Sequence, residues 1–361
     1  MTDRSGRRRR LGRAWPWIKY GGGIALAALA LWAVAGQRGE LSGASRYLAH
    51  LRWQWVIIGA GLELGSFVAF ALVQRRLLQA GGVTMSTGRL TSITLASTAI
   101  ANSMPGGQLV SLVFGYRQYR RRGADPALAG WTLGAVFVCA SVTLAIVAAV
   151  GVAVAGAEGD GLDLLGVTAG VLVLALAFGA LFVQRGAIVW AVTGTVRTSR
   201  RLVRWPGKEV DERIDGLIER LTAVTLTWTG LVSVTGWGLA NWVLDCGCLA
   251  LSFVALGLGV PWKGLLLAYG AAQLAANLPI TPGGLGVVEG SLTVALVAFG
   301  GSKGSTIAVV LLYRIVSFWA GLPVGWATWA ALVLSDRRAD RRTGAVAAEA
   351  AVAAAAVEVS P

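Results

Sequence analysis

Asn102-Ser-Met-Pro-Gly-Gly107 and Asn277-Leu-Pro-Ile-Thr-Pro-Gly-Gly-Leu-Gly286 are two stretches that resemble each other. Each joins an Asn to a Pro-Gly-Gly break, and each lies within apolar sequence long enough to enter a lipid bilayer. Hydrocarbon contains no water to hydrogen-bond a freed N–H or C=O, so broken backbone is tolerated at membrane depth only where it lines a cavity or is enclosed by protein. A matched pair of Gly/Pro-interrupted apolar segments, one in each half of a chain, is typical of the central binding site of a transporter.

The composition indicates a polytopic membrane protein. Hydrophobic residues make up 55% of the chain and charged residues 14%, against about 25% charged in soluble domains. The net charge of +14 arises from Arg and Lys residues that cluster between the apolar runs, as the positive-inside rule predicts, so we expect no nucleic-acid partner. The three cysteines lie in apolar segments and are interpreted as small core residues, with no metal site and no cofactor.

The apolar runs divide the chain into three regions. We expect a basic cytoplasmic arm at residues 1–16, a transmembrane domain at 17–335 and a disordered cytoplasmic tail at 336–361. Within the transmembrane domain, a first half (17–184) and a second half (222–335) are joined by an amphipathic cytoplasmic linker at 185–221, where apolar residues recur at helical spacing. Full spans are predicted at about 17–36, 53–73, 127–156, 164–183, within 222–258, and at 304–335 with a kink at Pro323. The run 222–258 exceeds one ideal span, and the sequence leaves open whether it forms one helix or two.

The basic residues also predict an orientation. Both termini and the Arg-rich links favour the cytoplasm, which is consistent only if residues 89–116 and 262–300 each enter and leave the membrane on one side. The predicted fold is therefore an all-α polytopic membrane protein of about six full spans plus two re-entrant helical hairpins in an inverted-topology repeat. We expect it in the cell membrane, with both termini in the cytoplasm.

Four ionisable residues fall at membrane depth: Glu63, Asp245, Glu289 and Arg314. A charge there is costly, so such residues face the protein interior and are candidates for function. Glu289 follows the second break at a helix start, where its carboxylate either takes part in transport or only caps its own helix. Arg314 either binds a phosphate or carboxylate directly or forms a buried pair with Glu289 or Asp245.

Asn241 and Asp245 lie on one helix face at i, i+4 spacing, either as a coupling site or as polar contacts between helices. Glu63 is a weaker candidate for the same roles. The Pro-Gly-Gly breaks themselves either expose adjacent N–H groups as an anion site or form simple enclosed turns. The run Arg117 to Arg122 is read as a topology anchor or as an attractor for anionic headgroups of the inner leaflet.

The second motif, from Asn277 through Glu289-Gly and followed by Tyr313-Arg314, resembles the lysylphosphatidylglycerol synthase / flippase-like integral membrane family. The first motif, followed by Tyr116-Arg117, looks like the corresponding first-half motif. The resemblance covers roughly residues 20–335 and implies a helical membrane protein that moves lipids between leaflets. By this resemblance, the lipid-binding residues would be Asn102, Pro105, Gly106, Gly107, Tyr116, Arg117, Asn277, Thr281, Pro282, Gly283, Gly284, Glu289, Tyr313 and Arg314.

The expected function is translocation of an anionic phospholipid or a polyprenyl-phosphate-linked lipid, with the headgroup held between the two breaks. Family members that synthesise aminoacyl lipid carry a large soluble domain after the membrane part, whereas about 26 residues follow here, so we expect no enzyme activity. Two alternatives stay open: a membrane enzyme acting on lipid-phosphate-linked sugars, and a non-transporting accessory subunit of a lipid synthase or glycosyltransferase. The sequence leaves open whether the chain forms a homo-oligomer.

Overall fold

A computed structural model of the chain describes residues 51–104, 106–156, 226–276 and 282–358. All regular structure in these residues is helical, as predicted. Within the described ranges, four helical stretches are long and apolar enough to cross a membrane: Trp53–Ala80 (α3), Pro126–Gly156 (α6), Trp228–Ala255 (α10) and Lys303–Arg342. They coincide with four predicted spans. The other two predicted spans, 17–36 and 164–183, lie outside the described residues, as do the basic arm and the amphipathic linker.

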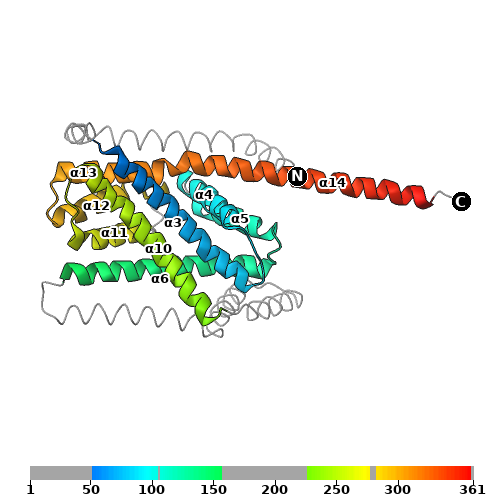
Figure 1. Cartoon of the computed structure of the whole chain (residues 1–361), viewed down its shortest axis with the longest axis horizontal. Helices are drawn as coiled ribbons and strands as arrows, with labels where there is room; N and C mark the ends of the chain where they lie inside the picture. Colours follow the sequence, from blue (N-terminus) through cyan, green and yellow to red (C-terminus); the bar gives the residue numbers. More distant parts are fainter. Residues whose placement is uncertain (1–50, 105, 157–225, 277–281, 359–361) are drawn as a thin grey trace, which may run out of the picture.

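Helix α10 resolves the ambiguity of the long apolar run, because one unbroken helix covers Trp228–Ala255. It packs along α3, and the two helices run next to each other through the centre of the molecule (Figure 1). Small side chains and a polar contact hold this pair together. A Cβ atom added to Gly59 of α3 would lie 3.7 Å from Cys248 Sγ of α10, and Ser66 Oγ donates to Asn241 Oδ1 over 3.1 Å. Asn241 therefore makes a polar contact between helices, which was one of the two roles predicted for it.

Two pairs of shorter helices flank the central pair, one on each side (Figure 1). They are α4 (Thr87–Ser103) with α5 (Gly107–Arg120), and α11 (Trp262–Ala276) with α12 (Val287–Ala298). The longest has 17 residues, which corresponds to about 25 Å of helix against about 30 Å of hydrocarbon. These lengths suit hairpins that enter the membrane and turn back.

The two halves pack on each other reciprocally. Helix α6, which ends the described part of the first half, packs on α11, and α14 (Gly321–Glu358) of the second half packs on α4. Glycine permits both close approaches. A Cβ added to Gly151 would lie 2.5 Å from Leu267 N, and one added to Gly325 would lie 2.4 Å from Leu95 O. Each pair of shorter helices therefore packs against a long helix of the other half in the part of the chain that the structure describes.

The final long helix departs from α geometry at one place. α13 (Lys303–Arg314) passes into a π-helical turn at Ile315–Trp319 before α14 begins. Ala320 N donates to Ile315 O over 2.8 Å, a bond to the fifth preceding residue. The turn lies just before Pro323, where a kink was predicted, because proline lacks an N–H and its ring displaces the preceding turn.

Helix α14 continues without a break to Glu358, where a disordered tail from residue 336 was expected. Alanine predominates in the last part of this helix and has the highest helix propensity. The structure therefore has helix through most of the expected tail. In Figure 1 this helix extends well beyond the packed body.

Candidate functional site

Both Pro-Gly-Gly breaks contain a glycine in a left-handed conformation directly after the proline. α4 ends at Ser103, and Gly106 takes a left-handed conformation (φ 70°) before α5 begins. In the second break Gly283 takes the same conformation (φ 60°) in a short 3-10 turn, Pro282–Gly284. These conformations favour glycine because a side chain would be strained there. Pro105, Asn277 and Thr281 lie outside the described residues.

In each break the second glycine, Gly107 or Gly284, packs against the helix that precedes the break. A Cβ on Gly107 would lie 2.5 Å from Ile100 O of α4, and one on Gly284 would lie 3.3 Å from Ala276 Cβ of α11. The limbs therefore approach closely where the chain reverses. The sequence similarity of the two breaks has a counterpart in their geometry.

The two breaks meet in space. The turn at Gly283 packs against the end of α4, and a Cβ on Gly283 would lie 3.3 Å from Asn102 Cβ. Trp326 of α14 adds a contact on the first break, since its Nε1 donates to Ser103 Oγ over 3.0 Å. Residues about 180 positions apart in the sequence thus form one site.

An ion pair adjoins this meeting point. Arg314 Nε donates to Glu289 Oε1 over 2.6 Å, with Arg314 and Glu289 side chains 9% and 24% exposed. Glu289 Oε2 also accepts from Gly286 N over 2.6 Å, so the carboxylate caps its own helix as well. The helix cap was one of the two readings of Glu289, and the buried pair with Glu289 was one of the readings of Arg314.

The guanidinium of Arg314 is fixed on three sides. Nη2 donates to Gly283 O over 3.1 Å, and the Phe318 ring lies 4.3 Å from Cζ in a cation–π contact. Arginine has five N–H donors, and two of them are used here. Among the described residues no hydrogen bond is formed by Nη1. A rigid cation with donors that the described residues leave unused, beside paired backbone breaks, is suited to an anion.

Asp245 lies in a second polar cluster. It accepts from Tyr269 Oη over 2.7 Å, from Tyr313 Oη over 2.8 Å and from Gln273 Nε2 over 3.1 Å. Glu63 of α3 faces the same carboxyl group and is 9% exposed. Tyr313 and Arg314 are consecutive, so the end of α13 joins this cluster to the ion pair.

Sequence reasoning did not find Tyr269, Gln273 or Phe318. Tyr269 and Gln273 are separated by four positions in an otherwise apolar run, the spacing that had singled out Asn241 and Asp245, so this signal was available. Phe318 carries no such signal, because an aromatic residue in an apolar helix is indistinguishable from a core residue.

The first half does not reproduce the tyrosine–arginine arrangement of the second. Tyr116 is half-buried and Arg117 is exposed, whereas Tyr313 and Arg314 are buried. The buried tyrosine of α5 is instead Tyr119, whose hydroxyl donates to Gln74 Oε1 over 2.7 Å. The structure therefore does not place Arg117 beside the breaks. A neutral polar contact occupies the corresponding interior.

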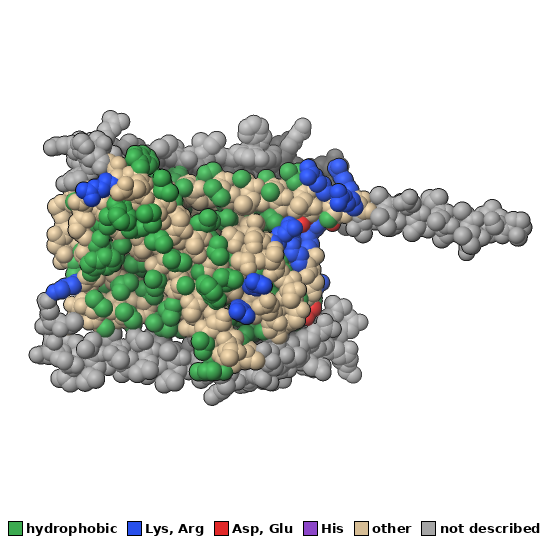
Figure 2. All heavy atoms as spheres, in the orientation of Figure 1, with side chains coloured by type: hydrophobic (Ala, Val, Ile, Leu, Met, Phe, Trp, Pro, Cys, Tyr) green, Lys and Arg blue, Asp and Glu red, His purple; other side chains and the backbone are tan. Residues whose placement is uncertain are grey.

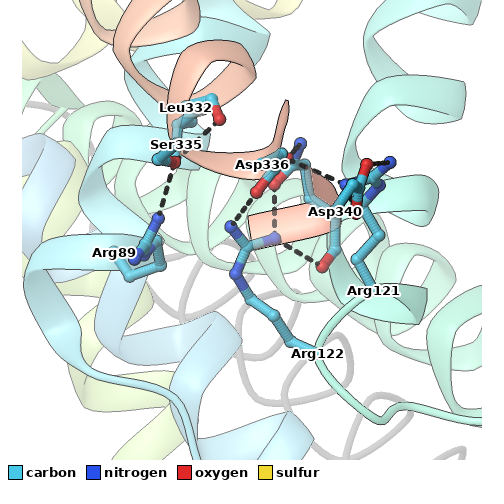
Figure 3. Close-up of polar contacts among 8 residues, drawn as sticks. Arg89, Arg121, Arg122, Leu332, Ser335, Asp336 and Asp340 are labelled. Carbon is cyan, nitrogen blue, oxygen red and sulfur yellow. Dashed lines mark hydrogen bonds and ion pairs between the residues drawn. The ribbon is translucent and has the colours of Figure 1, made fainter. Parts of the chain in front are cut away.

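A basic cluster lies at the far end of α5, where α14 leaves the packed body. Lys and Arg side chains gather there in Figure 2, while hydrophobic side chains spread over the middle of this face. Arg122 Nη2 lies 3.2 Å from Asp336 Oδ1, and Arg121 Nη2 lies 2.9 Å from Asp340 Oδ2 (Figure 3). Partial burial lowers the pKa of Arg122, and the hydrogen bond to Asp340 raises the pKa of Arg121. These contacts tie the end of α5 to α14.

Comparison with known proteins agrees with this architecture. The family described as "Lysylphosphatidylglycerol synthase TM region" matches residues 21–325. A protein of Methanothermobacter thermautotrophicus described as "UPF0104 membrane protein" is 28% identical over 127 residues, which are 32% of this chain and 37% of that protein. The chain thus matches only about a third of that relative's length. With the family match spanning nearly all of the predicted transmembrane domain, the chain belongs to the lysylphosphatidylglycerol synthase transmembrane region family.

Proposed function

We propose that this protein moves an anionic phospholipid or a polyprenyl-phosphate-linked lipid between the two leaflets of the cell membrane. The observation that carries the proposal is the meeting of the two breaks, with Gly283 against Asn102 and Arg314 fixed beside them. Broken backbone at membrane depth needs polar surroundings, and a buried guanidinium whose donors are not all taken by the described residues supplies an anion site there. The headgroup would sit between the breaks while the acyl or prenyl chains stay in lipid.

The ion pair gives the cycle two states. In one state Glu289 neutralises Arg314, as in the pair whose Nε and Oε1 atoms lie 2.6 Å apart. An incoming phosphate would compete with Glu289 for the guanidinium, because both present oxygens to the same N–H donors. Release of the phosphate on the other side would restore the pair. Glu289 is the more exposed partner and is held on the other side by one backbone N–H, so it is the group that moves.

The test is transport by the purified full chain in vesicles. Vesicles contain phosphatidylglycerol with a fluorescent acyl chain, and a membrane-impermeant reductant bleaches the probe only in the outer leaflet. We expect the protein to expose the inner-leaflet probe to bleaching. Glu289→Gln keeps a hydrogen-bonding side chain but removes the charge. It should slow this exposure at least about tenfold, which corresponds to about 1.4 kcal/mol in the barrier.

Ser291→Ala is the matched control. Ser291 lies on the same helix, and among the residues with a described position its hydroxyl bonds only to that helix, at Val287 O and Val288 O. This variant should transport at the wild-type rate. If the wild-type protein exposes no inner-leaflet probe with either phosphatidylglycerol or a polyprenyl-phosphate lipid, the proposal fails. Activity that appears only with an added synthase would instead support the accessory-subunit alternative, and a new glycosylated lipid would support the enzyme alternative.

A further inference from the structure

The cluster around Asp245 is not explained by headgroup binding. Three of its hydrogen bonds end on this carboxyl group, and a fourth joins Gln273 Nε2 to Tyr313 Oη over 3.3 Å. Tyr313 donates to Oδ1, while Tyr269 and Gln273 donate to Oδ2. Donors on both oxygens stabilise an ionised carboxylate. Asp245 and Gln273 are only partly buried, so the cluster reaches an accessible surface on their side.

Glu63 is the unusual member. It lies on α3 behind Asp245, is 9% exposed, and its Oε2 is buried with no hydrogen-bond partner in the described part of the chain. Its electrostatic partner is Asp245 of α10, and the two helices are in contact beside this pair, where Ser66 Oγ donates to Asn241 Oδ1 over 3.1 Å. Two interacting carboxyl groups require a proton on one of them, because two ionised carboxylates repel each other.

The other titratable groups that face the pair do not remove this requirement. They are Cys246 and Cys248 of α10, Tyr269 of α11, and Tyr313 and Arg314 of α13. Arg314 is the one cation among them, and it is bonded to Glu289. In the described residues of α4, α6 and the π-helical turn, no charged group acts on Glu63. Two ionised carboxylates side by side at membrane depth would therefore lack a neutralising partner.

We propose that Glu63 and Asp245 form a proton-binding site in which Glu63 carries the proton and Asp245 is the charged acceptor. The proton enters and leaves as H⁺ from water, so Glu63 alternates between a neutral carboxyl group and a carboxylate. The ligand is a proton rather than a metal cation because the surrounding groups present N–H and O–H donors to Asp245. Metal cations such as Mg²⁺ or Ca²⁺ need several oxygen acceptors instead.

The site also has a physical link to the breaks. Loss of the proton from Glu63 adds a negative charge beside Asp245, which favours rearrangement of the donors that hold it. One of these donors is Tyr313, and the next residue, Arg314, holds Glu289 and Gly283 O. Proton release is therefore coupled to headgroup binding at Arg314. This coupling rests on the proposed lipid movement, whereas the proton site itself does not.

The first experiment measures the proton directly. Infrared difference spectra of the full chain in vesicles are recorded as the pH is stepped, and the carbonyl-stretch band of a protonated buried carboxyl group is followed. We expect this band in the wild type at neutral pH and its loss in Glu63→Gln. It should remain in Asp340→Asn, which removes a carboxylate 61% exposed at the other end of the molecule. A wild-type protein without the band overturns the proton site, even if the Gln variant fails to fold. A band that persists in a folded Glu63→Gln variant overturns it as well.

The second experiment tests coupling, with the same vesicles under an imposed pH gradient. In the wild type we expect the gradient to drive the labelled lipid toward one leaflet, and to reverse that bias when the gradient is reversed. Glu63→Gln should equilibrate the lipid without a response to the gradient, and Asp340→Asn should respond as the wild type does. Wild-type movement that ignores the gradient overturns the coupling while the proposed function stands. If no lipid moves at all, the proposed function and the coupling both fail, and the infrared result alone decides the proton site.

Discussion

The losses in free energy of unfolding from removing Glu289 and Arg314 one at a time should add up to more than the loss from removing both together. Arg314 is the better buried partner, so Glu289→Ala leaves a nearly enclosed cation without its counter-charge. Breaking a buried pair costs about 3–5 kcal/mol, and the 24% exposure of Glu289 lets water reach the site, so the lower end applies. Loss of the helix cap at Gly286 N adds about 1 kcal/mol. We expect about 4 kcal/mol in total for Glu289→Ala.

Arg314→Leu should be milder. It leaves the carboxylate, but Glu289 is the more exposed member and keeps its bond to Gly286 N. Leucine also retains apolar contact with Phe318, so we expect a loss of about 2 kcal/mol. The double variant has no unpaired charge. It should lose about 3–4 kcal/mol rather than the additive 6 or so, a coupling of about 2–3 kcal/mol.

The assay is reversible unfolding of the full chain in mixed micelles of increasing SDS content, followed by tryptophan fluorescence. A coupling of 2–3 kcal/mol corresponds to roughly 30- to 150-fold in the unfolding constant. A control cycle pairs Glu289→Ala with Arg89→Leu. Arg89 bonds Ser335 near the other end of α4, about 20 Å along that helix from Asn102. This control should be additive. If the Glu289–Arg314 cycle is also additive within about 0.5 kcal/mol, the ion pair contributes no stability and the reasoning is refuted.

Two further predictions concern the breaks and the helix anchor. Gly283→Ala and Gly286→Ala each place alanine at positive φ, which costs roughly 1–2 kcal/mol. At Gly283 the new Cβ would also lie 2.3 Å from Phe318 Cε2, whereas at Gly286 nothing lies within 4 Å. Gly283→Ala should therefore destabilise the protein further in the same micelle assay, and equal losses would show that close packing at the second break is unimportant. Asp336→Asn should speed amide hydrogen exchange at the end of α5, because Asp336 accepts from both Gln118 Nε2 and Arg122. Asp340→Asn, whose partner is exposed, should leave exchange there unchanged, and a similar effect of both variants would mean that charge alone anchors the helices.

Several features of the site followed from local sequence. The Pro-Gly-Gly breaks, the helix that restarts before Glu289 and the polar spacing of Asn241 and Asp245 depend on a few adjacent residues. Proline removes a donor, and glycine accepts positive φ wherever it occurs. The pairing of Glu289 with Arg314 was one of two alternatives for Arg314, since a buried charge needs a partner but the sequence does not say which.

Analogy between the halves was a poorer guide. Tyr116 and Arg117 looked equivalent to Tyr313 and Arg314, yet Arg117 is exposed and Tyr119 occupies the interior instead. A helix presents a different face with each residue, since successive residues differ by about 100°. Two helices with similar motifs therefore bury different side chains when they are rotated differently about their axes relative to their neighbours.

The sequence by itself determined that this is a helical membrane protein interrupted by two glycine-rich breaks, because the absence of water in hydrocarbon constrains every residue of an apolar run. Only the tertiary structure brought Gly283 to Asn102 and gathered Glu63, Tyr269 and Tyr313 from three other helices around Asp245. These contacts join residues far apart in the chain, and they depend on how closely helices approach at glycines such as Gly151 and Gly325. Such an approach is a property of packed surfaces, which local periodicity does not specify.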